Sequence, residues 1–132
     1  MSNTGQILIV AEHDGEKLNP SVAKCVACAA SIDGATIDIA VFSDDGEAVA
    51  AAAANLAGIR KVLLIRHAEN KVALAAVLAP QVADLAADYS HVFGPSTTFG
   101  KDLMPRVAAL LGVNQISDVT CVVYQVRCHV VE

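Results

Sequence analysis

The chain has 132 residues, a formal net charge of −5, 55% hydrophobic residues and 17% charged residues. This length predicts one domain spanning residues 1–132, and the high hydrophobic content excludes a disordered chain. The negative charge argues against nucleic acid and anionic membrane surfaces as partners, because both repel an acidic protein.

The beginning of the chain does not resemble a targeting segment. Residues 1–6 carry no basic side chain and lead directly into an apolar run, unlike a signal peptide or an arginine-rich transit peptide. No apolar stretch reaches the roughly 18 residues that a membrane-spanning helix needs. We therefore expect a cytoplasmic protein without membrane insertion, in which the four cysteines stay reduced.

The first part of the chain alternates between strand-like and helix-like segments. Residues 7–11 are continuously apolar, which predicts a strand buried on both faces. Asn19 and Pro20 are typical of a helix start, and apolar residues follow at helical spacing as far as Ala29. Residues 36–42 are rich in β-branched side chains and predict a second strand.

The middle of the chain continues this alternation. Residues 43–45 are a serine and two aspartates, and we expect them to cap a helix that runs through the alanine-rich stretch to Leu56. Residues 61–66 predict a third strand. Residues 72–87 have the apolar period of a helix. Pro80 lacks the N–H donor that an interior helical position needs, so the helix either kinks at Pro80 or begins there, and we favour a start near Ala79.

The last third of the chain adds two more strands and a helix. Residues 91–94 predict a short strand, and residues 97–111 predict a helix in which Pro105 is a second break point. Residues 115–123 predict a fifth strand, and residues 124–131 continue as extended chain without a turn signal.

This order of elements predicts an α/β fold. Strands that alternate with helices form parallel pairs joined by right-handed crossovers. We therefore expect three layers, with a mainly parallel sheet of about five to six strands and helices on both of its faces. In such sheets, the segments at the carboxyl ends of the strands form the functional edge.

The loop at residues 94–101 gives the clearest local signal for a ligand. It joins a predicted strand to a predicted helix, where hydroxyls, backbone N–H groups and a lysine can bind an anion. It is not a P-loop, because five residues separate Gly94 from Gly100 and Asp102 stands where Ser or Thr would hold magnesium. The candidate anion or nucleotide residues are Ser96, Thr97, Thr98, Gly100 and Lys101. The same residue types also cap helices without any ligand, so both interpretations stay open.

Two other clusters are weaker candidates. Cys25 and Cys28 have CxxC spacing, but Pro20 places the helix start at least a turn earlier than a redox cysteine requires, which favours buried thiols. Residues 12–14 (Glu-His-Asp) and His67 could meet as a metal or acid–base cluster, but they lack helical spacing. We predict no catalytic residue and no metal ligand, since none of the common catalytic motifs is present.

Two segments resemble a known family. Residues 95–118 begin Pro-Ser-Thr-Thr-Phe-Gly-Lys-Asp-Leu-Met-Pro-Arg and end Gln-Ile-Ser-Asp. This segment resembles the signature PAT-x-FGK-x-LLPRVAA-x-L-x-V-x-QISD of the electron transfer flavoprotein alpha-subunit family. Residues 7–20 (ILIVAEHDGEKLNP) are similar to the first strand and loop of the same family. The resemblance covers nearly all of residues 7–123.

The resemblance implies a subunit of an electron carrier and not an enzyme. The family's heterodimer takes electrons on one FAD from acyl-CoA and other dehydrogenases, as in fatty acid β-oxidation, and passes them to a membrane quinone oxidoreductase. The matching domain in the family is an adenine nucleotide alpha-hydrolase-like, Rossmann-like layer that packs against the beta subunit. The family's FAD lies mainly in a later domain, so we expect this chain alone to bind none. The expected subunit-interface residues are Phe99, Lys101 and Arg106.

A second hypothesis keeps the fold but changes the function. In it, the loops at residues 12–15 and 94–101 hold AMP or ATP, and the chain is a stand-alone nucleotide-binding module. However, Glu12 and Asp14 would place two carboxylates opposite the phosphates, so we expect no tight binding of either nucleotide. A thiol or metal enzyme that uses the CxxC pair is a third hypothesis.

Overall fold

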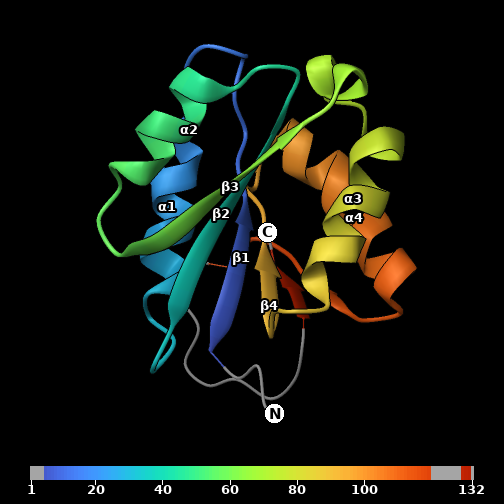
Figure 1. The fold of residues 1–132 in the computed structure, drawn as a ribbon. Helices are drawn as coiled ribbons and strands as arrows, with labels where there is room; N and C mark the ends of the chain where they lie inside the picture. The colour runs from blue at the N-terminus through green and yellow to red at the C-terminus, as the bar shows by residue number, and fades with distance from the viewer. Residues whose placement is uncertain (1–4, 120–128, 132) are drawn as a thin grey trace.

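The computed structural model describes residues 5–119 and 129–131 (Figure 1). Strands and helices alternate along most of this length, as the sequence predicts. In chain order the elements are β1 (Gln6–Val10), α1 (Ser21–Ala29), β2 (Thr36–Ser43), α2 (Glu47–Ala54), β3 (Ile59–Arg66), the short 3-10 helix η1 (Ala68–Lys71), α3 (Ala75–Ala86), β4 (His91–Phe93), α4 (Thr98–Leu111), β5 (Gln115–Ile116) and β6 (His129–Val131).

The strands form one sheet in the order β3-β2-β1-β4-β6-β5, and neighbouring strands are parallel. Helices α1 and α2 cover one face of the sheet, and α3 and α4 cover the other (Figure 1). The predicted three-layer α/β fold with a mainly parallel, Rossmann-like sheet is thereby confirmed. Because the strands are parallel, their carboxyl ends lie at one end of the sheet, where loops from different strands can meet.

Strand β1 lies in the centre of the sheet and shows why its sequence is continuously apolar. Successive side chains of a strand point to opposite faces. Ile7 and Ile9 join a core cluster with residues of α1 and α2, whereas Leu8 and Val10 join a second cluster with residues of α3 and α4. All four side chains are completely buried, so the prediction of a strand buried on both faces is confirmed.

Helix α3 begins at Ala75, so the expected start near Ala79 was wrong. Pro80 lies inside the helix and lacks the N–H that would bond to the carbonyl of Ala76. Both Pro80 and Ala76 are exposed, and water can therefore take the place of the lost bond. Pro105 likewise does not break α4, which is continuous from Thr98 to Leu111.

The predicted fifth strand was too long. Strand β5 contains only Gln115 and Ile116, and Asp118 then adopts a left-handed backbone conformation with a φ of 56°. Aspartate tolerates this conformation better than most residues. The rest of the expected strand, from residue 120, and residues 124–128 of the expected extended segment lie outside the described residues. The end of that segment is β6, which pairs with β4 and β5.

Candidate functional site: the carboxyl end of the sheet

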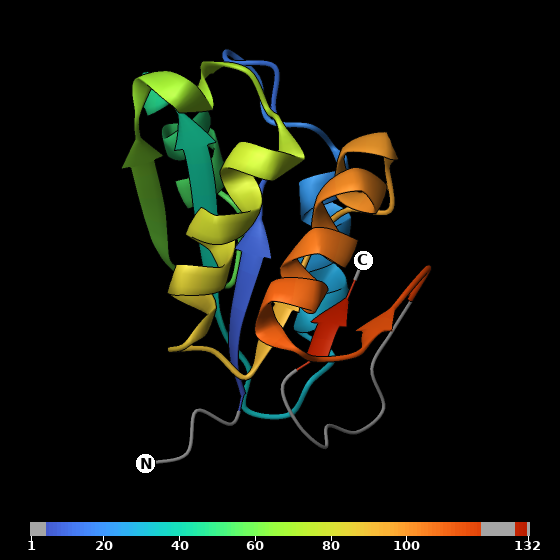
Figure 2. The same ribbon diagram turned by 90° about the vertical axis from the view of Figure 1, so that its right-hand side faces the viewer.

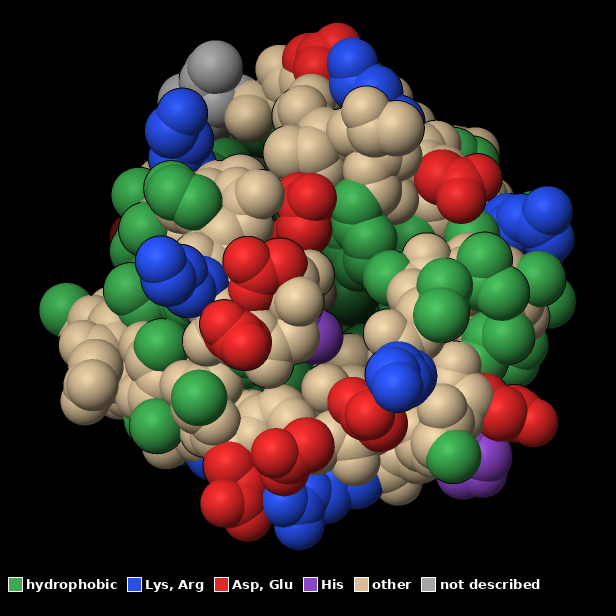
Figure 3. Space-filling view, turned by 90° about the horizontal axis from the view of Figure 1, so that it is seen from above, with side chains coloured by type: hydrophobic (Ala, Val, Ile, Leu, Met, Phe, Trp, Pro, Cys, Tyr) green, Lys and Arg blue, Asp and Glu red, His purple; other side chains and the backbone are tan. Residues whose placement is uncertain are grey.

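The strands point toward the same end of the molecule (Figure 2). Figure 3 looks down on this end and shows acidic side chains around a hollow. We call this end the rim. It is formed by the segments that follow the strands, namely residues 12–15 after β1, residues 43–46 after β2, residues 66–67 at the end of β3, and residues 94–101 after β4.

A hydrogen bond joins the loop after β4 to the loop after β1. Thr97 is the N-cap of α4, and its hydroxyl oxygen accepts a hydrogen bond from the backbone N–H of Gly100 at 3.3 Å. The same hydroxyl donates to the half-buried Glu12 carboxylate at 2.7 Å. The Thr97 hydroxyl, which the sequence predicts to bind an anion, thus caps α4 and donates a hydrogen bond to a carboxylate.

The other predicted anion-binding side chains also face a carboxylate. The Ser96 hydroxyl donates to Oδ1 of Asp118, and the Lys101 ammonium lies 4.0 Å from the same oxygen. The side chains of Lys101 and Asp118 are 57% and 70% exposed, so this ion pair adds little stability. Thr98, at the first position of α4, is exposed.

Gly100 allows the loop to pack closely on the first turn of α4. A Cβ atom at Gly100 would lie only 1.7 Å from the carbonyl oxygen of Pro95, closer than any real contact. A Cβ at Gly94 would lie 2.6 Å from Sδ of Met104. The neighbouring Phe99 is partly buried and packs against the core cluster beneath α3 and α4. This local packing explains why the segment needs glycines at these two positions.

A cavity of about 260 Å³ lies between α1 and the loop after β4. Its lining comprises Ser21, Lys24, Cys25, Cys28, Phe93, Gly94, Pro95, Ser96, Thr97 and Val119. The Ser21 hydroxyl oxygen is buried and has no hydrogen-bond partner among the described residues. Burial raises the pKa of the Cys25 thiol to about 12, so this thiol is protonated at neutral pH and packs as a small apolar side chain.

The predicted cluster of residues 12–14 with His67 does not assemble. The His13 Nδ1 atom accepts from Gly15, so Nε2 carries the proton that it donates to the Phe42 carbonyl at 2.8 Å. Backbone N–H groups of Lys17 and Glu16 donate to Asp14 and lower the pKa of its carboxyl. The side chains of residues 12–14 therefore bond separately, to the N-cap of α4, to β2 and within their own loop, and His67 caps η1 instead. Across the part of the chain that the structure describes, no group of three His, Cys, Asp or Glu residues could hold a metal ion.

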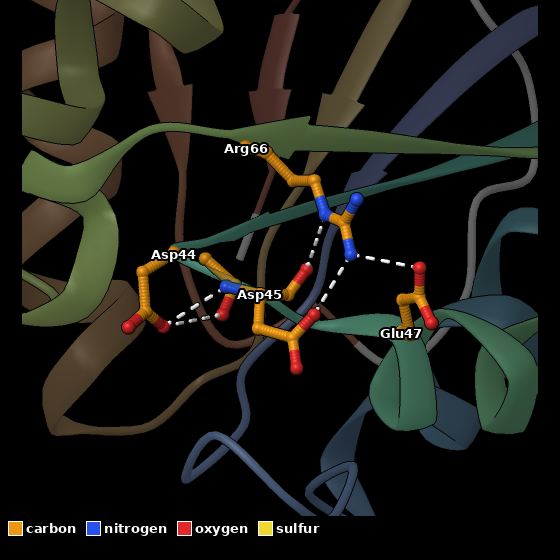
Figure 4. Close-up of polar contacts among 5 residues, drawn as sticks. Asp44, Asp45, Glu47 and Arg66 are labelled. Carbon is orange, nitrogen blue, oxygen red and sulfur yellow. Dashed lines mark hydrogen bonds and ion pairs between the residues drawn. The ribbon is translucent and has the colours of Figure 1, made fainter.

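The acidic residues after β2 bind an arginine and do not cap α2, contrary to the prediction (Figure 4). The Arg66 guanidinium donates to the carboxylates of Asp45 and Glu47, both at 2.8 Å, and to the Asp45 carbonyl at 3.0 Å. Asp44 accepts from the N–H of Asp45. The N-cap position of α2 belongs to Gly46, whose φ of 74° turns the chain into the helix.

The three expected interface residues have different surroundings. Phe99 packs toward the core, and Lys101 lies beside Asp118. Arg106 lines a groove between α3 and α4. The sequence carries no local sign of this groove, because the exposure of its side chains depends on how α3 and α4 pack.

A second feature missed by the sequence analysis lies away from the rim, near the start of β2. Asp38 has no exposed surface. Arg60 donates to its two carboxylate oxygens at 3.0 Å and 2.6 Å, and the Tyr89 hydroxyl donates at 2.6 Å. Burial alone would raise the pKa of Asp38, but the hydrogen bonds from Arg60 and Tyr89 hold it below its usual value. A charged residue inside an apolar strand was the sequence signal.

Comparison with known proteins identifies related chains. The model of the electron transfer flavoprotein domain family matches residues 7–131. The chain is 44% identical over 117 residues to electron transfer flavoprotein subunit alpha of Pseudomonas aeruginosa, covering 89% of this chain and 38% of the relative. For the same subunit of Paracoccus denitrificans the identity is 39%, covering 88% of this chain and 37% of the relative. The identity to the mitochondrial subunit alpha of Dictyostelium discoideum is 32%, covering 86% of this chain and 34% of the relative.

The chain thus spans little more than a third of the length of these relatives. Within residues 5–119 and 129–131, no helix has both the length and the apolar character needed to cross a membrane.

Proposed function

The chain belongs to the electron transfer flavoprotein family and is homologous to its alpha subunits, and from this we propose that it is the partner-binding base domain of such a subunit. In this proposal, residues 1–132 form one domain that docks onto a beta subunit. The heterodimer carries electrons on FAD, and the chain contributes binding and positioning without catalysing a reaction itself. Acyl-CoA dehydrogenases and other dehydrogenases supply the electrons, and a quinone oxidoreductase receives them from the whole complex.

The contact between the two signature segments is the observation that carries this proposal. Thr97 lies in the segment that resembles the family's FGK signature, and Glu12 lies in the segment that resembles its first strand and loop. Their hydrogen bond at 2.7 Å joins segments that are distant in sequence. The close packing of Gly100 against Pro95 explains why the FGK-like segment has a glycine at this position. Because these signature residues contact other parts of the protein, we infer that the domain has a structural and docking role.

The described residues do not fit the pyrophosphate of FAD. The hydroxyls of Ser96 and Thr97 donate to Asp118 and Glu12, whose negative charges would repel phosphates at the start of α4. Lys101 already lies next to Asp118. FAD therefore belongs, in this proposal, to parts of the heterodimer outside these residues, and we derive no step through it.

A cytoplasmic location is part of the proposal. The buried Cys25 is a free thiol, and free thiols are typical of reducing compartments. The stand-alone AMP- or ATP-binding module is not favoured, because the similar proteins are electron transfer flavoprotein subunits and the rim is acidic (Figure 3).

A binding measurement tests the proposed function. The beta subunit of the Pseudomonas aeruginosa electron transfer flavoprotein is titrated into the chain and the complex is followed by sedimentation velocity. We expect a heterodimer with a Kd tighter than about 10 μM. An unrelated acidic α/β protein of similar size serves as the control titrant. Absence of a complex at 100-fold higher concentrations would contradict the proposal.

A further inference from the structure

Strand β3 lies at one edge of the sheet, beside β2 (Figure 2). It is eight residues long, whereas β5 at the opposite edge has two residues. An edge strand presents backbone N–H and C=O groups to which a further strand can bond. The backbone of this edge therefore specifies the kind of group that fits it, namely another extended strand.

The backbone groups of Val62 and Leu64 face away from the sheet. The N–H of His67 donates to the carbonyl of Ser43 in β2 at 3.0 Å, and the backbone groups of successive residues in a strand point to alternate sides. Residues 63 and 65 therefore bond to β2, while residues 62, 64 and 66 point outward. Among the residues that the structure describes, none bonds to the backbone of Val62 or Leu64 on this outer side.

The middle of β3 is apolar on both of its faces. Leu63 and Ile65 pack against the core cluster beneath α3 and α4, whereas Val62 and Leu64 pack against the cluster beneath α1 and α2. All four side chains are only partly buried, whereas residues 37–41 of β2 are buried. A strand added at this edge would therefore cover apolar side chains of both layers and would also pair the backbone.

The charged residues that flank this apolar segment are balanced by carboxylates. Lysine and arginine on an edge strand usually oppose the addition of another strand. Here the Arg60 guanidinium is bound to Asp38, and that of Arg66 is bound to Asp45 and Glu47. Because these carboxylates offset the positive charge, a second edge of the same kind is not repelled as a whole.

We propose that two copies of this chain pair through β3 in an antiparallel arrangement. A two-fold axis perpendicular to the sheet continues both layers from one copy to the other, and it places outward-facing residues opposite each other. In the register that fits best, Leu64 faces Leu64 of the second copy. Leu63 then faces Ile65, and Val62 faces Arg66. The pairing does not rest on the proposed function, because it follows from the backbone and side chains of this chain alone.

Charge selects this register over its neighbour. An axis at Leu63 would place Arg60 opposite Arg66, and like charges that lie directly opposite each other destabilise a strand pair. In the proposed register Arg60, Lys61 and Arg66 instead face an alanine, a histidine and a valine. The register centred on Leu64 therefore keeps the cations of the two strands apart.

Leu64→Cys tests the register directly. Opposite residues of a hydrogen-bonded antiparallel pair have Cα atoms about 5.5 Å apart, which a disulfide can bridge. Leu63→Cys is the matched control, because its Cα would lie about 8 Å from that of the same residue in the second copy. With oxidised glutathione as the oxidant, we expect at least about tenfold more cross-linked dimer for Leu64→Cys than for Leu63→Cys. The unmodified chain, which has four cysteines, gives the background.

Leu64→Lys tests the same edge without a covalent bond. Two lysines would meet at the two-fold axis, and we expect the Kd of the dimer to rise at least about tenfold. Leu110→Lys is the matched control, since Leu110 is exposed on α4 and does not belong to β3. Sedimentation velocity over a series of concentrations measures the Kd of each variant.

Each outcome supports or overturns the pairing. An unmodified chain that stays monomeric at about 500 μM overturns it. Equal cross-linking of Leu64→Cys and Leu63→Cys overturns it as well, and so does a dimer that Leu64→Lys and Leu110→Lys weaken equally. Equal melting temperatures of the two lysine variants exclude unfolding as the cause, and the cross-linking result decides if Leu64→Lys does not fold. None of these results changes the proposed function, which the titration with the beta subunit tests separately.

Discussion

The side chain of Asp38 is held in its charged form by its neighbours. A carboxylate without exposed surface is costly unless its oxygens are hydrogen-bonded. Arg60 and Tyr89 supply these bonds from the start of β3 and from the segment before β4. The three residues therefore link the starts of β2 and β3 to the segment before β4, at the end of the sheet away from the rim. Removing Arg60 leaves the buried carboxylate of Asp38 without its counter-charge, which costs more than the intact pair contributes.

Arg60→Ala tests this connection. We expect it to lower the free energy of unfolding by about 2–3 kcal/mol, below the range for fully buried pairs because Arg60 is 44% exposed. Urea unfolding at pH 7 measures the loss. Arg66→Ala is the matched control, because its carboxylate partners Asp45 and Glu47 are exposed, and it should cost less than about 1 kcal/mol. Equal losses in the two variants would show that burial of Asp38 is unimportant.

The same carboxylate makes stability depend on pH. The folded pKa of Asp38 lies below the usual value of an aspartate carboxyl. Its contribution is therefore complete above that value and is lost as the pH falls through the lower, folded pKa. Unfolding experiments between pH 7 and pH 2 should show a steeper acid loss for the natural chain than for Asp38→Asn. Parallel curves for the two proteins would contradict this expectation.

Gly100 gives a prediction of a different kind. Gly100→Ala places a Cβ atom 1.7 Å from a backbone oxygen, and the loop after β4 must move. We expect a loss of about 3 kcal/mol in the free energy of unfolding. Gly112→Ala is the control at the other end of α4. Its φ is 66° but a Cβ would meet nothing within 4 Å, so the backbone strain alone should cost about 1 kcal/mol.

At the scale of elements, tertiary packing determines the bounds of a helix or strand when the local sequence signals conflict. The strand at residues 7–11 was predictable because burial on both faces leaves an uninterrupted apolar run. The start of α3 was not, because the local effect of Pro80 is outweighed by the burial of Ala75, Leu78 and Ala79 against the sheet. A proline can remain inside a helix when it lies on the exposed face of that helix. The sequence alone did not show that Pro80 lies on the exposed face of α3.

Pro80→Ala measures what the proline costs. Alanine restores the N–H donor to Ala76 and removes the clash of the ring with the preceding turn. We expect the free energy of unfolding to rise by about 1–2 kcal/mol, since the gain is reduced by greater freedom in the unfolded chain. Thermal unfolding checks this, with Pro105→Ala as a second exposed helix position. A loss of stability would indicate that the ring makes contacts in α3 that outweigh its missing bond.

At the scale of the whole molecule, the rim brings together segments that are far apart in sequence. The sequence predicted which loops lie at this end, because parallel strands share one carboxyl edge. It did not predict the bonds from Thr97 to Glu12 and from Ser96 to Asp118, because such pairings depend on the tertiary fold and leave no local pattern. It also missed the groove between α3 and α4, which exists only after the two helices have packed.

The acidic rim leads to a prediction about nucleotides. We expect AMP and ATP to bind with a Kd weaker than about 10 μM, with or without magnesium, because Glu12 and Asp118 already occupy the hydroxyls at the start of α4. Calorimetric titration is the measurement. Tighter binding that disappears in Lys101→Ala would instead favour the nucleotide-binding module.

The central position of β1 also has a consequence for how the chain is made. Residue 7 pairs with residue 37 on one side and with residue 91 on the other. A ribosome releases β1 first but cannot supply its second neighbour until β4 has been synthesised. During that interval an apolar strand has an open backbone edge, which invites pairing with other chains. The rate of translation between β1 and β4 therefore sets how long this strand edge stays unpaired in the nascent chain.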